Sequence, residues 1–124
     1  MKIFFVGIHN KLGLKPLDSS TKSGKLIDRI ISNLNGEECI KTNLFDCNEI
    51  PCQEIKKFQK SWIKKYNPKD EDIIILLGNN TQKLFPKNIC KRIIGVKHPS
   101  IIWSNKNKKK YIRNTLEKIN SLSL

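Results

Sequence analysis

DIIILLG, residues 72–78, is the clearest strand in this sequence of 124 residues. Its five consecutive apolar residues are not interrupted by polar ones, and such a run is typical of a strand that is buried on both faces. Three other segments are strand candidates: KIFFVGI at residues 2–8, CIKTNLF at 39–45 and RIIGV at 92–96. Because these runs lack a regular apolar–polar alternation, they favour a parallel sheet over an antiparallel one.

Helical patterns separate these strands along the chain. SGKLIDRIISNLNG, residues 23–36, repeats apolar residues at helical spacing and ends on Gly36, a typical stop residue. A second helix is expected after Pro51, a brief one over 81–85 and a terminal one over 105–121. The inward face of the second helix is predicted to carry Ile55, Phe58, Trp62 and Ile63. The inward face of the terminal helix is predicted to carry Tyr111, Ile112, Leu116 and Ile119.

The alternation of strands and helices predicts one α/β domain over residues 1–124. We expect a three-layer α/β/α arrangement around a short, mainly parallel four-stranded sheet, with right-handed crossovers. Ligands of such sheets bind in the crevice beyond the carboxyl ends of the strands. Three segments hold both histidines near those ends and predict a site at one edge of the sheet: GIHNKLG at 7–13, TNLFDCN at 42–48 and KHPS at 97–100.

The charge of the chain is strongly unbalanced. Twenty-four Lys and Arg residues stand against eleven Asp and Glu residues, which gives a formal net charge of +13. A small domain with this excess is suited to a polyanionic partner, and nucleic acid is the favoured one. The alternative is a lysine-rich proteome that raises the charge of every protein.

The cysteines do not have the spacing of a metal site. Cys39, Cys47, Cys52 and Cys90 include no CxxC pair, so we expect free thiols and neither a metal nor a cofactor. No apolar run is long enough to span a membrane, and the first residues lack the features of a signal peptide. The predicted protein is a monomer in the cytoplasm or associated with the nucleoid, not secreted and not bound to a membrane.

At the segments that end the strands, the sequence resembles the uracil-DNA glycosylase superfamily. The resemblance rests on VGIHNKLG, IKTNLFDC, DIIILLGNNTQKLF and VKHPS, which occur in the family's order. STKSGKLIDRII and IPCQEIKKF are similar to segments of its compact single-domain members, although the iron–sulfur cysteine spacing of those members is absent. The resemblance implies a uracil-DNA-glycosylase-like fold and a DNA glycosylase that flips and excises a uracil-type or other modified base.

The resemblance also implies roles for individual residues. His98 is expected to donate a hydrogen bond to the departing base, and Asn10 or His9 to position the attacking water. Asn43 is expected to recognise the base, in a pocket that includes Gly7 and Ile8. The alternatives are a histidine that caps the turn before Pro99, and asparagines that satisfy backbone groups at a strand end or in a turn.

Contacts with DNA are expected around the same edge. After His98, Pro99 and Ser100 are predicted to press on the DNA backbone while Ile101, Ile102 or Trp103 enters the gap left by a flipped nucleotide. In the alternative, Ile101 and Trp103 pack under the last helix. Phosphate contacts are predicted for Ser23 and Lys25 at the first helix N-terminus, and for Lys106, Lys108, Lys109, Lys110 and Arg113, which otherwise form a solvated helix face.

Two other functions compete with the glycosylase. One is a catalytically inactive protein on the same fold that binds DNA or a modified base, favoured by an irregular first loop and by the lack of an aromatic residue there. The other is an α/β enzyme acting on a free nucleotide or nucleoside. That enzyme would need carboxylates near the strand ends, where the candidates are Asp18, Asp46 and Glu49.

Overall fold

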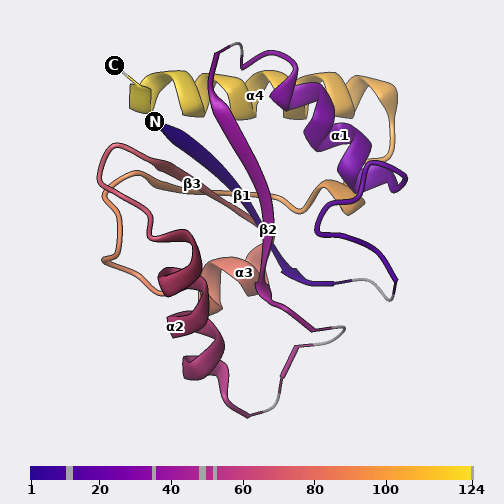
Figure 1. The fold of residues 1–124 in the computed structure, drawn as a ribbon. Helices are drawn as coiled ribbons and strands as arrows, with labels where there is room; N and C mark the ends of the chain where they lie inside the picture. The colour runs from indigo at the N-terminus through magenta and orange to yellow at the C-terminus, as the bar shows by residue number, and fades with distance from the viewer. Residues whose placement is uncertain (11–12, 35, 48–49, 52, 124) are drawn as a thin grey trace.

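A computed structural model describes residues 1–10, 13–34, 36–47, 50–51 and 53–123 (Figure 1). Its sheet has the order β2-β1-β3-β4, and each neighbouring pair is parallel. The predicted α/β class and parallel sheet are therefore confirmed, while Glu49 and Cys52 lie outside the described residues. The strands are β1 (Lys2–His9), β2 (Glu38–Phe45), β3 (Ile73–Leu77) and β4 (Ile93–Val96).

Helices cover both faces of this sheet. Helices α1 (Lys22–Ile31) and α4 (Asn105–Ser123) lie on one face, and α2 (Ile55–Tyr66) and α3 (Asn79–Leu84) lie on the other (Figure 1). A short 3-10 turn, η1 (Pro99–Ile101), joins β4 to α4. This order of layers is compatible with the expected three-layer α/β/α arrangement.

Helix α1 begins as its sequence predicts but ends early. Thr21 is its N-cap, and the Thr21 hydroxyl accepts a hydrogen bond of 2.9 Å from the Gly24 backbone N–H. The helix stops at Ile31, five residues before Gly36. The side chains of Ser32 and Asn33 both donate to the Arg29 carbonyl, so the Asn33 N–H bonds to Ile30 in a tighter turn instead.

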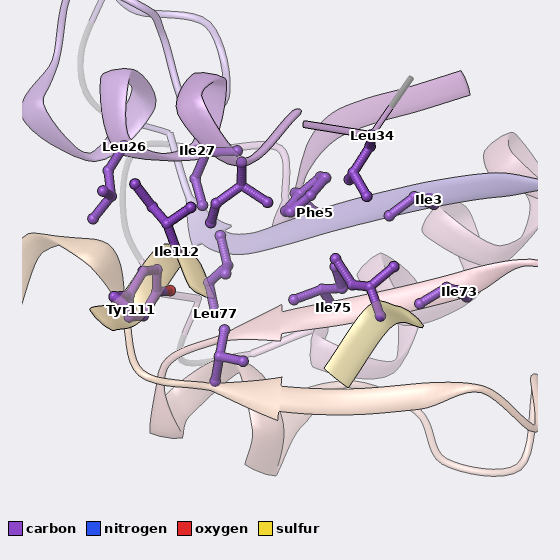
Figure 2. Packing of buried hydrophobic residues seen from close by; sticks show 13 residues of the cluster. Ile3, Phe5, Leu26, Ile27, Leu34, Ile73, Ile75, Leu77, Tyr111 and Ile112 are labelled. Atoms are coloured by element: carbon purple, nitrogen blue, oxygen red, sulfur yellow. The ribbon is translucent and has the colours of Figure 1, made fainter. Parts of the chain in front are cut away.

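The core consists of two apolar clusters, one on each face of the sheet. On the α1–α4 face, alternate residues of β1 and β3, such as Phe5 and Ile75, pack in one cluster with Ile27 and Ile112 (Figure 2). On the α2–α3 face, Phe4 packs edge-on against Trp62, with 5.6 Å between the ring centroids. Full burial of each such side chain contributes about 1.5–3 kcal/mol, so most of the stability comes from these two layers.

The apolar residues after His98 do not lie as the packing alternative predicted. Ile101 is 54% exposed and Trp103 is 82% exposed, while Ile102 packs against the α1–α4 cluster. The reason is the η1 turn, which is closed by backbone hydrogen bonds from Ile101 to His98 and from Ile102 to Pro99. The prediction that Ile101 and Trp103 pack under the last helix is therefore wrong.

The cysteines and the helices bear on two other classes of protein, metal-binding and membrane-spanning. Cys39 and Cys90 are free thiols, and Cys90 is buried. Among the described residues, no group of three His, Cys, Asp or Glu side chains is arranged to hold a metal ion. In the same part of the chain, no helix has the length and apolarity needed to cross a membrane.

Phe4→Ala is expected to lower the free energy of unfolding by about 3–5 kcal/mol, because it leaves a cavity in a packed layer. The fully buried Phe4 ring contacts both Trp62 and Tyr66. Urea denaturation followed by circular dichroism measures the loss. Ile101→Ala is the control, since it shortens an exposed aliphatic side chain and should change stability by less than about 0.5 kcal/mol. Equal losses in the two variants would contradict the placement of Phe4 in the core.

Candidate functional site

The carboxyl ends of β1, β2 and β4 meet around one pocket, as predicted from the parallel sheet. The pocket has a volume of about 190 Å³ and brings together His9, Asn43 and His98, which are 34 to 89 positions apart in the sequence. The loop between β1 and α1 forms much of its wall. The other lining residues are Gly7, Ile8, Leu14, Lys15, Leu17, Asp18, Thr21, Ser23 and Ser100.

His98 has a defined hydrogen-bonding direction. Its Nδ1 accepts a hydrogen bond of 3.1 Å from the Ser100 backbone N–H and lies 2.8 Å from the Ser100 hydroxyl. Because a backbone N–H can only donate, a neutral His98 ring carries its hydrogen on Nε2. His98 therefore caps the η1 turn, as the structural alternative predicted, and is also one of the residues that line the pocket.

Two neighbours hold the segment that carries His98. Tyr111 on α4 donates a hydrogen bond of 2.6 Å to the Lys97 carbonyl, and burial raises the pKa of the Tyr111 phenol. On the other side, Gly78 after β3 has a φ of +92°, and a Cβ atom there would lie 3.2 Å from the His98 Cβ. The Leu-Gly pair that ends β3 thus allows the chain to pass close behind His98.

His9 has the opposite polarity. Its Nδ1 lies 3.1 Å from the Asn10 carbonyl oxygen, which can only accept, so Nδ1 carries the hydrogen. The Nε2 of a neutral His9 is then an acceptor. When both rings are neutral, His98 carries its hydrogen on Nε2 and His9 carries it on Nδ1, and both residues line one pocket.

Asn10 is not brought into this pocket. Its side-chain nitrogen donates to Asp46 over 2.9 Å, and its side-chain oxygen accepts from the Asn43 amide over 2.6 Å. It lines a second cavity of about 310 Å³ on the α2 side, which Asn43 also borders. The structure therefore places His9, and not Asn10, beside His98.

The Asp46 carboxylate determines how Asn43 is turned. A carboxylate only accepts, so the Asn10 nitrogen must face Asp46 and the Asn10 oxygen must face the Asn43 nitrogen. The Asn43 oxygen lies on the opposite side, against the Cα of Gly7, where a side chain would collide with it. Asn43 is 9% exposed, and its side-chain oxygen, which can accept a hydrogen bond, is adjacent to the pocket-lining residue Gly7.

Asp18 lines the pocket as well, although the sequence suggested it only for an enzyme acting on free nucleotides. Hydrogen bonds from the backbone and side chain of Ser20 hold the pKa of the Asp18 carboxyl below its usual value. The pocket therefore contains a carboxylate that is ionised at neutral pH. The Asp-Ser-Ser sequence ahead of the Thr21 cap is the signal that could have indicated it.

Lys41 on β2 stabilises the wall of the pocket, a role that the sequence did not suggest. Its ammonium group donates to the Leu17 carbonyl over 3.0 Å and to the Ser19 hydroxyl over 3.3 Å, and forms an ion pair with Asp28 on α1. Burial alone would raise the pKa of Asp28, but the hydrogen bonds from Lys41 and Ser19 hold it below its usual value. Lys41 thus ties the loop to both β2 and α1.

The predicted phosphate site at the start of α1 needs a correction. Ser23 is 7% exposed and Gly24 is buried under the backbone of Leu17 and Asp18, so this helix end does not face solvent. Its Gly24 N–H is already bonded to Thr21. Ser23 lines the pocket instead, and the exposed Lys25 does not.

The residues predicted to contact DNA are mostly at the surface. Ser100, Ile101 and Trp103 are exposed, but Pro99 is buried and is not available to press on a DNA backbone. Across the described ranges only two ion pairs form, Lys41–Asp28 and a long Lys57–Glu54 pair of 3.9 Å, so most of the positive charge is not neutralised. On α4 the exposed cations are Lys106, Lys109, Lys110 and Arg113, with Lys108 half-buried.

No family model matches this chain, and comparisons with curated proteins and with solved structures found no match. The resemblance to the uracil-DNA glycosylase superfamily therefore stays a prediction, and so does the fold of that family.

Lys41→Met is expected to lower the free energy of unfolding at pH 7 by about 1–2 kcal/mol, because two hydrogen bonds are lost. The substitution should also remove the part of the pH dependence of the unfolding free energy that comes from Asp28. The lowered pKa of Asp28 stabilises the folded state at neutral pH, and this contribution is lost as the pH falls below about 4. Urea denaturation from pH 7 to pH 3 measures both effects.

Lys57→Met is the matched control for Lys41→Met. It removes a lysine whose ion pair is long and whose side chain is 74% exposed, so stability and its pH dependence should stay unchanged. If Lys41→Met kept the acid-dependent loss of the unmodified protein, the role given to the Lys41–Asp28 pair would be wrong.

Proposed function

We propose that this protein is a DNA glycosylase that takes a modified base into the His98 pocket and hydrolyses its N-glycosidic bond. The observation that carries the proposal is the pair of histidines with opposite polarity in one pocket, His98 as donor and His9 as acceptor. Hydrolysis of a glycosidic bond needs a donor for the leaving base and an acceptor for the attacking water. The excess of positive charge supports a polyanionic substrate.

The bond between the base and the sugar carbon breaks with its electron pair moving to the base. His98 Nε2–H would donate a hydrogen bond to the base oxygen as negative charge develops, a contribution of roughly 2.7–4 kcal/mol for one well-placed donor. Water would attack the sugar carbon and pass its proton toward His9 Nε2. The ionised Asp18 carboxylate would stabilise the positive charge on the sugar.

Asn43 would recognise the base. Its acceptor lies against Gly7, and its amide nitrogen is engaged by Asn10. An acceptor in this place favours a base that has a ring N–H next to a carbonyl, as uracil, hypoxanthine and xanthine have. Cytosine and adenine present a ring lone pair there, which an acceptor repels. Asn10 would then be a positioning residue that holds Asn43, in place of the water-positioning role predicted from the sequence.

A second candidate function is a catalytically inactive protein that binds DNA or a modified base through the same pocket. The observation that favours it is the engagement of Asn10 by Asn43 and Asp46, since Asn10 carries the side chain expected to hold water in the family. This function retains the pocket and the charge but needs no attacking water.

An excision assay separates the two functions. Oligonucleotides with one uracil, hypoxanthine or xanthine, single- or double-stranded, would be incubated with the protein and then treated with alkali. We expect cleavage at the modified base, and a decrease in rate of about 10²–10³ for His98→Ala and of about 10²–10⁴ for His9→Ala. Asp70→Asn, before β3 at the opposite edge of the sheet, is the control and should keep the rate.

Two results would contradict the glycosylase. If no substrate were cleaved while DNA binding stayed tight and sensitive to salt, the protein would be a binding protein. If cleavage occurred but persisted in both histidine variants, the active site would lie elsewhere.

A further inference from the structure

Trp103 is an unusual surface residue. Three large hydrophobic residues are exposed among the described residues, and Trp103 is the most exposed of them at 82%, with Ile101 at 54% two positions before it. Trp62, the second tryptophan of the chain, is 3% exposed, so the exposure of Trp103 is not a general feature of tryptophan in this fold. A large aromatic ring left in water is typical of a contact surface.

The Trp103 ring is held in one orientation although it is exposed. Its indole N–H donates a hydrogen bond of 3.0 Å to the Ser100 carbonyl. This bond satisfies the single polar group of the indole, so what the ring offers to a ligand is its apolar surface. Ser100 also lines the His98 pocket, so this hydrogen bond ties the Trp103 ring to a residue of the pocket wall.

A basic groove begins at the same segment. It has a volume of about 380 Å³ and lies between the β4–η1 segment and α4. Its cations are Lys97, Lys110 and Lys118, all exposed, and none of the described residues that line it is acidic.

A positive groove next to a fixed aromatic ring fits a single-stranded nucleic acid. Such ligands are bound by cations that follow the phosphates and by aromatic rings on which unpaired bases stack. A protein partner would need a wider apolar surface than Ile101 and Trp103 provide, because Ile101 shares its groove with three lysines. A base inside a duplex is covered by its neighbours on both faces and is not free to stack on Trp103.

We propose that the strand next to the pocket is bound as single-stranded DNA, with one base stacked on Trp103 and the phosphates in the groove of Lys97, Lys110 and Lys118. This inference rests on the proposed function in taking the ligand to be DNA. It adds the substrate class, which is single-stranded and not double-stranded DNA.

Binding of a fluorescein-labelled thymidine oligonucleotide of about 12 nucleotides tests the inference by fluorescence anisotropy. We expect Trp103→Ala to weaken single-strand binding roughly 5- to 100-fold, and Trp103→Tyr, which keeps a stacking surface, to retain most of it. A duplex of the same length should bind more weakly than the single strand and should be insensitive to Trp103→Ala. Intrinsic fluorescence should be quenched by the single strand, because Trp103 is exposed and Trp62 is buried.

The groove is tested by the salt dependence of the same binding reaction. Each of Lys110→Gln and Lys118→Gln should reduce the slope of log affinity against log salt by about 0.7, the value for one phosphate contact on a single strand. Lys69→Gln is the control, because Lys69 is exposed before β3 at the opposite edge of the sheet. It should change the slope less than either groove variant.

Unchanged single-strand affinity in Trp103→Ala, or equal affinity for duplex and single strand, would overturn the inference. The thymidine oligonucleotide contains no uracil, hypoxanthine or xanthine, so this test does not depend on excision. Excision without a Trp103 effect would refute the inference alone. A Trp103 effect without excision would refute the glycosylase and leave the single-strand site in place.

Discussion

Burial of β1 and β3 on both faces is the constraint on which the rest of the structure depends. The side chains of Ile3 to Val6 and Ile73 to Leu77 point alternately to the two faces, and all of these residues are buried. Two apolar faces require two helical layers, so α1 and α4 cover one face and α2 and α3 the other. Because the strands are parallel, their carboxyl ends, and the polar segments that follow them, meet at one edge.

At that edge, the hydrogen-bond partners of the side chains decide which of their atoms donate and which accept. His98 and His9 are the same residue type, yet a backbone N–H makes Nδ1 an acceptor in the first and a carbonyl makes it a donor in the second. The Asp46 carboxylate likewise fixes the orientation of the Asn10 side-chain amide, and Asn10 in turn fixes that of Asn43. The polarity of the pocket is therefore a property of the loops, which Lys41 and Tyr111 fix to the sheet and helices.

Most of the fold could be predicted from the sequence, because burial selects apolar residues wherever a strand or a helix face meets the core. The four strands lie where the apolar runs indicate, and α2 and α4 turn the predicted faces inward. The end of α1 could not be predicted in this way. It depends on Ser32 and Asn33 competing for the Arg29 carbonyl, a local competition that hydrophobic periodicity does not record.

The sequence by itself determined the strands, the parallel sheet, the edge that carries the polar residues and the positive charge. Only the tertiary structure decided which polar residues share a pocket: His9 joins His98, Asn10 turns to Asp46, and Asp18 enters through the loop that Lys41 holds. It also decided that Trp103 is exposed while Ile102 is half-buried against the α1–α4 cluster. Apolar burial follows from composition and period, whereas a hydrogen bond depends on which groups are adjacent in space, and only the folded chain specifies that.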